Sequence, residues 1–199
     1  MKVQITKHYN EDLPNEFAAA TVDAGRNVKA SKRYWFWTGH SPIRMFKYFI
    51  KLKGLKTFIS VHLVRHKIGV EHAVTSKRTD LRVNPDELVT RDTPVVHVMD
   101  INAQSLMSMA EKRLCLKSHS ETVGVMRRIK KEIAKVEPEL APFLVPHCVS
   151  HGSICPEKQI CSPGIAKVMS CYMDYPLMPK HIKDWIKDEQ KTWSRNKCK

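Results

Sequence analysis

The stretch His62-Leu63-Val64-Arg65-His66-Lys67, followed a little further on by Thr75-Ser76-Lys77-Arg78, decides how this chain is interpreted. It places two imidazoles and two cations at the end of an apolar run, with hydroxyls and two more cations behind them. Arginine offers planar, forked donors to phosphate oxygens and can also stack on rings, which lysine cannot do. A hydroxyl or backbone N–H beside an arginine completes an anion-binding concavity. The pattern therefore indicates a phosphate site beside a flat ring, and a solvated basic loop is the alternative.

Composition points to a globular protein with anionic ligands. The chain has 199 residues, of which 42% are hydrophobic and 27% charged, enough for one domain with a sizeable core. Its formal net charge of +14 favours nucleotides, nucleic acid or several phosphorylated ligands in one oligomer. No apolar stretch approaches the roughly 20 residues that span a bilayer, and residues 1–5 read as a strand rather than a signal peptide. We expect a cytoplasmic location and no membrane association.

Hydrophobic periodicity predicts a mixture of strands and helices. Strands are expected at residues 3–8, 48–54 and 95–101, where apolar and polar side chains alternate or an apolar run is short. Helices are expected at residues 15–25, 105–115 and 121–136, and the last should stop before Pro138. Residues 55–64 are a helix or a second apolar segment, and residues 83–91 are a loop or a short helix. The fold class is therefore α+β.

Two local signals precede the first long strand. Tyr34-Trp35-Phe36-Trp37 is an aromatic cluster, which favours core packing over a base-stacking platform. Ser41-Pro42 is typical of a helix start, with serine as N-cap and proline in the first turn.

Several short motifs follow one another along the chain in an order that bears on its function. Gly39-His40-Ser41-Pro42-Ile43 comes first, then the apolar run with Arg65-His66-Lys67 at its end, then Ser76-Lys77-Arg78. Asn102-Ala103-Gln104-Ser105 follows, and after it Arg113 and Glu121. Over residues 35–130 this order resembles the flavin-dependent thymidylate synthases, the ThyX family. Their pattern runs G-H-x-S-P-(L/F)-E-H, R-H-R, S-x-R-Y, N-A-R-S, and L-R followed by A-Q-x-E-I.

The resemblance implies a fold and an activity. It implies a ThyX-like fold, a central, mostly antiparallel sheet flanked by helices, over residues 1–145. Residues 146–199 would be a cysteine-rich segment and basic tail packed on the same domain. It implies methylation of dUMP, with FAD as hydride carrier, methylene-tetrahydrofolate as carbon source and NADPH as reductant. The family's pocket is shared between subunits of a homotetramer, and no enzyme cysteine attacks the uracil ring, so the protein mainly binds and polarises.

The same resemblance implies roles for single residues. Flavin contacts would be Arg65, His66, Lys67, Asn102, Gln104 and Ser108. Substrate contacts would be Ser76 and Arg78 at the dUMP phosphate, Arg113 at the uracil ring, and Glu121 and Arg91. Arg113 and Ser76 would act in catalysis. Placing Ser76 and Arg78 at S-x-R requires one residue inserted after Arg65-His66-Lys67; without it, Thr75 and Lys77 take those positions.

The chain also departs from the family pattern. Met45 stands where the family has a flavin-binding histidine, and the glutamate before that histidine is absent. Lys67 replaces the second arginine of R-H-R, Gln104 the arginine of N-A-R-S, and Thr79 the tyrosine after S-x-R. These changes bear on flavin binding, so fold similarity is better supported than identity of reaction.

The cysteines are unevenly spread. Cys148, Cys155, Cys161 and Cys171 fall in one region, while Cys115 lies in an expected helix and Cys198 near the end. Cys148, His151, Cys155 and Cys161 could supply the four tetrahedral ligands of a structural Zn²⁺. The paired C-x2-C spacing of common zinc sites is missing, so buried free thiols are the alternative.

Three further interpretations stay open. The first is a non-catalytic ThyX-like protein that binds nucleic acid or nucleotides, which the charge favours; nonspecific nucleic-acid binding is also expected of a basic enzyme. The second is a variant that transfers a hydroxymethyl group to dUMP. The third is a zinc-stabilised interaction module.

Overall fold

The computed structural model describes residues 1–22, 27–162 and 164–195. Its centre is a sheet of four strands in the order β1-β2-β4-β3, in which every neighbouring pair is antiparallel. The strands are β1 (Lys2–Lys7), β2 (Lys47–Lys56), β3 (Val70–Val74) and β4 (Pro94–Asn102). Helices are present besides the sheet, so the predicted α+β class is confirmed.

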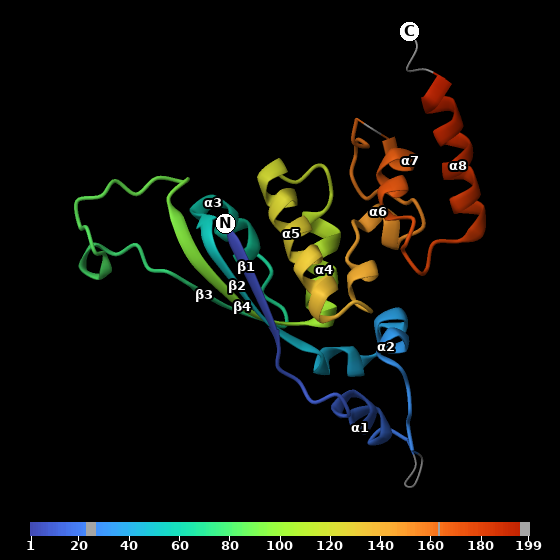
Figure 1. The fold of residues 1–199 in the computed structure, drawn as a ribbon, viewed down its shortest axis with the longest axis horizontal. Coiled ribbons are helices and arrows are strands. Elements are labelled where there is room, and N and C mark those ends of the chain that lie inside the picture. Colours follow the sequence, from blue (N-terminus) through green and yellow to red (C-terminus); the bar gives the residue numbers. More distant parts are fainter. Residues whose placement is uncertain (23–26, 163, 196–199) are drawn as a thin grey trace.

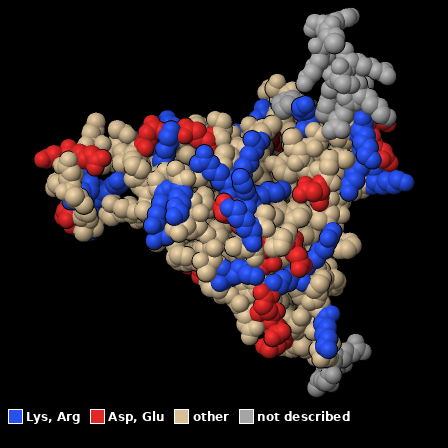
Figure 2. Space-filling model, viewed as in Figure 1, with Lys and Arg blue, Asp and Glu red and all other residues tan. Residues whose placement is uncertain are grey.

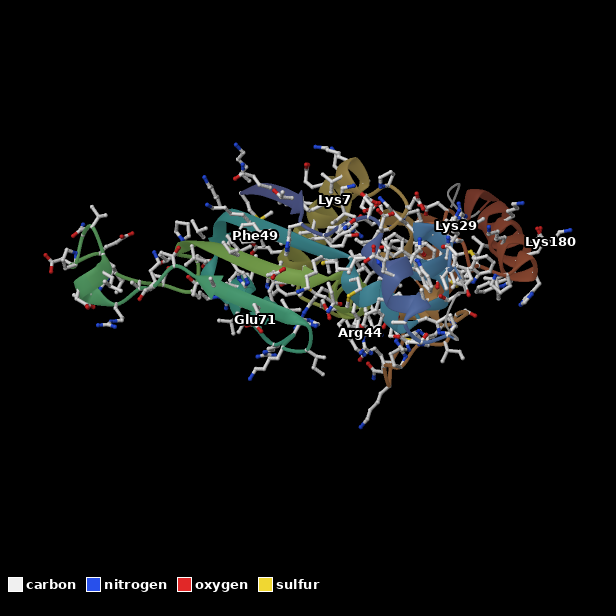
Figure 3. The ribbon with its side chains drawn as sticks, turned by 90° about the horizontal axis from the view of Figure 1, so that it is seen from below. Lys7, Lys29, Arg44, Phe49, Glu71 and Lys180 are labelled. Atoms are coloured by element: carbon white, nitrogen blue, oxygen red, sulfur yellow. The ribbon has the colours of Figure 1, made fainter. Side chains whose placement is uncertain are left out.

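The strands present one apolar face because side chains alternate along them. On β2, Tyr48, Ile50 and Leu52 are buried, and their partners across β4 include Ile101 and Met99. The neighbouring positions, such as Phe49, face the other side and are more exposed. Figure 3 looks onto this second face, where Phe49 and Glu71 are labelled and α5 lies behind the strands.

Three helices cover the apolar face of the sheet (Figure 1). They are α3 (Thr57–Val64), α4 (Ala103–Arg113) and α5 (Ser120–Val136). In α4, Leu106, Met109 and Ala110 are buried, and α5 buries a stripe that includes Met126 and Ile129. Burial of such stripes is the main stabilising contribution to a helix in a folded protein.

Further helices lie at the ends of the molecule. Near the base are α1 (Leu13–Ala19), α2 (Lys32–Thr38) and the 3₁₀ helix η1 (Ser41–Met45). The 3₁₀ helix η2 (Thr79–Leu81) lies in the loop between β3 and β4, a loop that projects away from the rest of the chain (Figure 1). The C-terminal layer contains η3 (Ala141–Phe143), α6 (His147–Ser150), α7 (Gly164–Met169), η4 (Ser170–Tyr172) and α8 (Lys180–Arg195). One buried apolar cluster includes side chains from the sheet, α4, α5 and this layer.

The sequence predictions agree with these elements in most places. Strands at 3–8, 48–54 and 95–101 and helices at 105–115 and 121–136 are confirmed to within two residues, and residues 55–64 are helical from Thr57. Residues 83–91 form turns and irregular backbone. No helix among the described residues is long and apolar enough to cross a membrane.

Two local predictions were wrong, and the core packing expected of the aromatic cluster is confirmed for two of its four residues. The helix expected at 15–25 ends at Ala19, and residues 23–25 lie outside the described part of the chain. Ser41-Pro42 opens a 3₁₀ helix whose N-cap is His40, so Ser41 is not the cap. The aromatic cluster forms a helix of its own, capped by Ser31, in which Trp35 and Phe36 are buried while Tyr34 and Trp37 are exposed.

Candidate functional site

The loop between α3 and β3 is fixed to the start of α4 by a small hydrogen-bond network. Asn102 caps α4 by accepting from the backbone N–H of Ser105, at 2.9 Å, and its amide donates to the carbonyl of Gly69, at 3.3 Å. Ser105 Oγ donates to the carbonyl of Ile68, at 2.8 Å. Gly69 has φ +66°, and a Cβ there would overlap Asn102 and Ser105. The predicted flavin contact Asn102 thus holds the loop that carries Arg65-His66-Lys67.

A cationic cavity lies at this junction. Its volume is about 590 Å³, and the described residues that line it include no Asp or Glu. Five predicted cofactor contacts meet there, from two chain segments that are far apart in the sequence. The lining residues are Arg44, Arg65, His66, Lys67, Ile68, Gln104, Ser105 and Ser108.

Arg44 is a lining residue that the sequence reasoning missed. It occupies the position of the family's absent glutamate, and its Nε donates to Oε1 of Gln104, at 2.6 Å. The resemblance places an arginine at position 104, where this chain has glutamine. The guanidinium missing at position 104 is therefore present in the same cavity, supplied by η1 instead of α4. Figure 3 labels Arg44 at the end of the sheet away from the projecting loop.

Arg113 holds His66 in one protonation state. Arg113 donates from Nε to Nε2 of His66, at 2.9 Å, and from Nη2 to the carbonyl of His62, at 2.6 Å. Burial first, and then the charge of Arg113, lower the pKa of His66 to about 4. His66 is therefore neutral near pH 7, and because its Nε2 accepts a hydrogen bond from Arg113, its Nδ1 carries the ring hydrogen. The cavity thus contains a neutral imidazole with one N–H to donate.

A chain of hydrogen bonds, buried at His97 and part-buried at His72, supports the same loop. Nε2 of His72 donates to the carbonyl of His66, at 2.7 Å, because a carbonyl can only accept. In the tautomers that satisfy every atom, Nδ1 of His72 then accepts from Nε2 of His97, at 2.9 Å, and Nδ1 of His97 accepts from the hydroxyl of Ser60, at 2.8 Å. His97 is fully buried, and its pKa is lowered to about 4 by burial and by His72. One set of tautomers satisfies the whole chain.

Ser76 and Arg78, predicted at the substrate phosphate, lie at the other end of the sheet. Val70 pairs with Ile101 beside the cavity, whereas Val74 pairs with His97, so β3 carries the chain about 13 Å away before Ser76 is reached. Ser76 Oγ accepts from the backbone N–H of Arg78, at 3.3 Å, and Arg78 forms an ion pair with Asp80, at 2.7 Å. A single chain does not bring these residues to the cavity.

Arg91 and Glu121 form a third group, at the start of α3. The Arg91 guanidinium lies 4.6 Å from the ring centroid of Phe58, and His119 meets the same ring edge to face, at 4.9 Å. Glu121 pairs with Lys56, at 2.7 Å, and Lys56 also pairs with Asp92, at 3.2 Å. The predicted substrate contacts of one chain therefore lie at three places, of which only that of Arg113 adjoins the cavity.

The proposed zinc ligands also separate. Burial first, and then the neighbouring Cys115, Cys155 and Cys161, raise the pKa of the Cys148 thiol to about 11, so three other thiols lie near Cys148. Cys115 was not predicted as part of this group, because it lies far away in the sequence. His151 lies instead beside Glu111 and His147. Cys198 lies outside the described residues.

Positive charge is spread beyond the cavity. Figure 2 shows lysine and arginine side chains over much of one face, with carboxylates between them. Several of the cations are on α5, whose exposed side carries Arg127, Arg128, Lys131 and Lys135.

Comparisons with known proteins identify the fold. No protein-family model matches the chain, and no curated protein matches it. Among solved structures, it is similar to ThyX from Helicobacter pylori with FAD and dUMP, with a TM-score of 0.57, 14% identity, and coverage of 70% of this chain and 97% of that one. A second H. pylori ThyX complex with FAD and dUMP gives a TM-score of 0.53 at 15% identity, with the same coverage.

A third solved structure also has a similar fold. PolB from Streptomyces cacaoi, a UMP/dUMP methylase bound with 5-Br dUMP, gives a TM-score of 0.54 at 13% identity. The match covers 78% of this chain and 98% of that one. The predicted ThyX-like fold is confirmed, in a divergent form.

Proposed function

We propose that this protein is a flavin-dependent enzyme that adds a one-carbon group to dUMP, with FAD bound in the cavity beside His66. The observation that carries the proposal is the cavity itself, where Arg65, His66, Lys67, Gln104 and Ser108 converge from separate segments. It lies in a fold whose solved neighbours include complexes with FAD and dUMP. Its cations suit the FAD diphosphate, and Arg44 supplies the guanidinium that Gln104 lacks.

The residues of this chain would bind and orient. Arg44, Arg65 and Lys67 would hold anionic oxygens, and the Nδ1–H of His66 would donate to a ring or phosphate acceptor. Arg113 uses two of its five donors on His66 and His62, which leaves donors for a pyrimidine carbonyl. When bound, reduced FAD would supply the hydride, methylene-tetrahydrofolate the carbon, and NADPH would reduce the flavin.

The substrate phosphate site would be completed by a second copy of the chain. Ser76 and Arg78 are on the projecting loop, away from the cavity of their own chain. The same loop exposes large apolar side chains: Leu81 is 62% exposed, Leu88 81%, and Val83 fully. Such surface is typical of an interface. We therefore propose a homo-oligomer, a tetramer by the resemblance, in which this loop brings Ser76 and Arg78 of one copy to the cavity of another.

Calorimetric titration tests the proposal. FAD should bind the protein, and dUMP should tighten that binding if both share one site. Arg113→Ala and Arg78→Ala should each remove measurable dUMP binding, whereas Arg33→Ala, at an exposed position on α2, should leave it unchanged. Unaltered dUMP affinity in both site variants would refute the assignment.

A binding function without chemistry is the competing proposal, and the net charge of +14 favours it. A nucleic-acid-binding protein on this fold would bind single- or double-stranded nucleic acid with an affinity that falls steeply with salt. It would show no preference for free dUMP and no FAD-dependent turnover. The same titrations, repeated with an oligonucleotide at two salt concentrations, separate the two functions.

A further inference from the structure

Away from the cationic cavity, three side chains from two helices point their ligand atoms at one another. Glu111 is on the last turn of α4, and His147 and His151 are one turn apart at the two ends of α6. One ligand atom from each residue lies within 4.8 Å of the other two. The Nδ1 atoms of His147 and His151 are 3.9 and 3.8 Å from the two carboxylate oxygens of Glu111. Helix α6 lies beside α4 (Figure 1).

The side chains of Glu111, His147 and His151 do not hydrogen-bond to one another. Nδ1 of His151 lies 2.9 Å from Ser150 Oγ and 3.2 Å from the carbonyl of His147, contacts that it would exchange for the ion. Nδ1 of His147 is buried and has no hydrogen-bond partner, although it faces the carboxylate of Glu111. The two imidazole rings are stacked, with centroids 3.7 Å apart and an interplanar angle of 10°. A buried polar atom without a partner is rare in folded proteins and calls for an ion or a water. Two imidazoles and one carboxylate are a known ligand set of Zn²⁺.

The surroundings of the three residues suit a metal ion. Ser150 Oγ donates to Oε1 of Glu111, at 2.7 Å, and so orients the carboxylate, as outer groups do at metal sites. A cavity of about 190 Å³ adjoins Glu111 and His147, with room for a fourth ligand. Its wall includes the thiols of Cys115, Cys148 and Cys155. Nitrogen ligands beside soft thiols favour a transition metal over Mg²⁺ or Ca²⁺.

We propose that Glu111, His147 and His151 bind a divalent transition-metal ion of the Zn²⁺ type, with a water in the fourth position facing the cavity. Ligands of a tetrahedral Zn²⁺ are about 3.4 Å apart, so the two nitrogen–oxygen distances of 3.9 and 3.8 Å would shorten by about 0.5 Å. One imidazole would also turn out of the stack, because the lone pairs of two parallel rings cannot both point at one ion. The ion would join α4, which carries Ser108 and Arg113, to the C-terminal layer through α6. This set differs from the cysteine-based set expected from the sequence, because it uses two residues that the sequence reasoning did not select.

Metal binding by the purified full-length protein tests the proposal. After dialysis against Zn²⁺, elemental analysis should find one ion per chain. Glu111→Gln and His151→Asn should each weaken Zn²⁺ binding at least about tenfold in competition with a chromogenic chelator. The controls are Glu157→Gln, which changes a carboxylate in the same cavity wall, and His40→Asn, an exposed histidine elsewhere. Both should bind as the unaltered protein does.

The absorption spectrum of bound Co²⁺ gives a second test, which uses the unaltered protein and does not depend on the folding of any variant. With Co²⁺ in the proposed site, the visible ligand-field bands should appear without an intense thiolate-to-cobalt charge-transfer band in the near ultraviolet. A strong charge-transfer band that is lost in Cys155→Ser or Cys161→Ser would assign the ion to the thiols and overturn the proposal. Failure to bind Zn²⁺ or Co²⁺ would overturn it as well.

Discussion

At the scale of single residues, Arg44 and Gln104 join η1 to the first turn of α4 in the wall of the cationic cavity, through a hydrogen bond of 2.6 Å. Arg65, His66 and Lys67 could be selected because they follow an apolar run, and Gln104 and Ser108 because a motif places them. Arg44 could not be selected, since only the fold brings η1 against the first turn of α4. The capping role of Asn102 was not predicted, although asparagine is a favoured N-cap residue.

Arg44 gives the first prediction at this scale. If it replaces the guanidinium that position 104 lacks, Arg44→Ala should weaken FAD binding about tenfold, on the order of 1.5 kcal/mol, by removing a charge-assisted donor. Arg33→Ala is the matched control. Calorimetric titration of FAD into each variant measures the effect. Equal affinities for FAD in the two variants would exclude Arg44 from the binding site.

Gly69 gives a prediction about stability. Gly69→Ala combines a left-handed backbone with overlap of the new methyl group against Ser105 and Asn102. Gly54 has a similar φ of +72°, but a Cβ there would meet only the backbone of Met1, at 3.8 Å. Gly54→Ala should therefore lower the free energy of unfolding by about 1 kcal/mol, from the backbone alone. Gly69→Ala should lower it by about 3 kcal/mol. Urea denaturation of the two variants compares them; similar losses would mean that the loop relaxes around the methyl group.

At the scale of elements, the segments with strong hydrophobic periodicity were predicted. Strand β3, which depends on pairing with β4, was not. The sequence shows the alternation of apolar and polar side chains along β2 and β4, and it shows the apolar stripe of α5. Strand β3 has only five residues, and it exists because β4 offers it an edge to pair with. Its His72 then meets His97 across the ladder, a contact no local pattern contains. Tertiary pairing therefore builds the histidine chain that supports the cavity.

The buried histidine chain predicts a pH dependence of stability. The folded-state pKa of His97 is about 4, below its ordinary value of 6.5, so the unfolded chain binds the proton more readily. Its contribution to stability is therefore complete above pH 6.5 and is lost as the pH falls toward 4. Between pH 6.5 and 5 the loss from His97 alone should be on the order of 2 kcal/mol, and His66, whose pKa is also lowered to about 4, should add a similar loss. Urea unfolding at a series of pH values measures it.

The control for this pH effect is an exposed histidine. His40→Asn should keep the full dependence, because His40 lies at the surface. His97→Gln should be less stable at pH 7, since Ser60 and His72 lose their shared partner, but its stability should vary less between pH 6.5 and 5. The same pH dependence in His97→Gln and the unaltered protein would place the titrating group elsewhere.

At the scale of the whole molecule, the separation of the predicted substrate residues becomes an argument about assembly. Sequence motifs list residues in order but do not say which copy of the chain contributes each one. The register of β3 keeps Ser76 and Arg78 away from the cavity of their own chain, and the loop that carries them exposes Leu81, Val83 and Leu88. A site shared between copies reconciles the motif with this geometry.

A site shared between two copies predicts that two variants, each unable to bind dUMP, can restore binding when they assemble together. Arg78→Ala and Arg113→Ala should each fail to bind dUMP alone, because each lacks one half of every site. When the two variants are mixed, unfolded and refolded together, some sites receive Arg113 from one copy and Arg78 from another, so part of the dUMP binding should return. Refolding each variant separately, and then mixing without exchange of subunits, is the control.

The apolar loop supplies the complementary test of assembly. Val83→Asp places a charge on a fully exposed apolar side chain, which costs little in an isolated chain but opposes burial against another copy. Light scattering should show a smaller assembly, and dUMP binding should fall with it, while FAD binding in the cavity of each chain should be affected less. Two results together would place the phosphate site within one chain: Val83→Asp leaves the assembly and dUMP binding intact, and Arg78→Ala refolded together with Arg113→Ala still fails to bind dUMP. Ser76 and Arg78 would then have to reach the cavity by movement of their own loop.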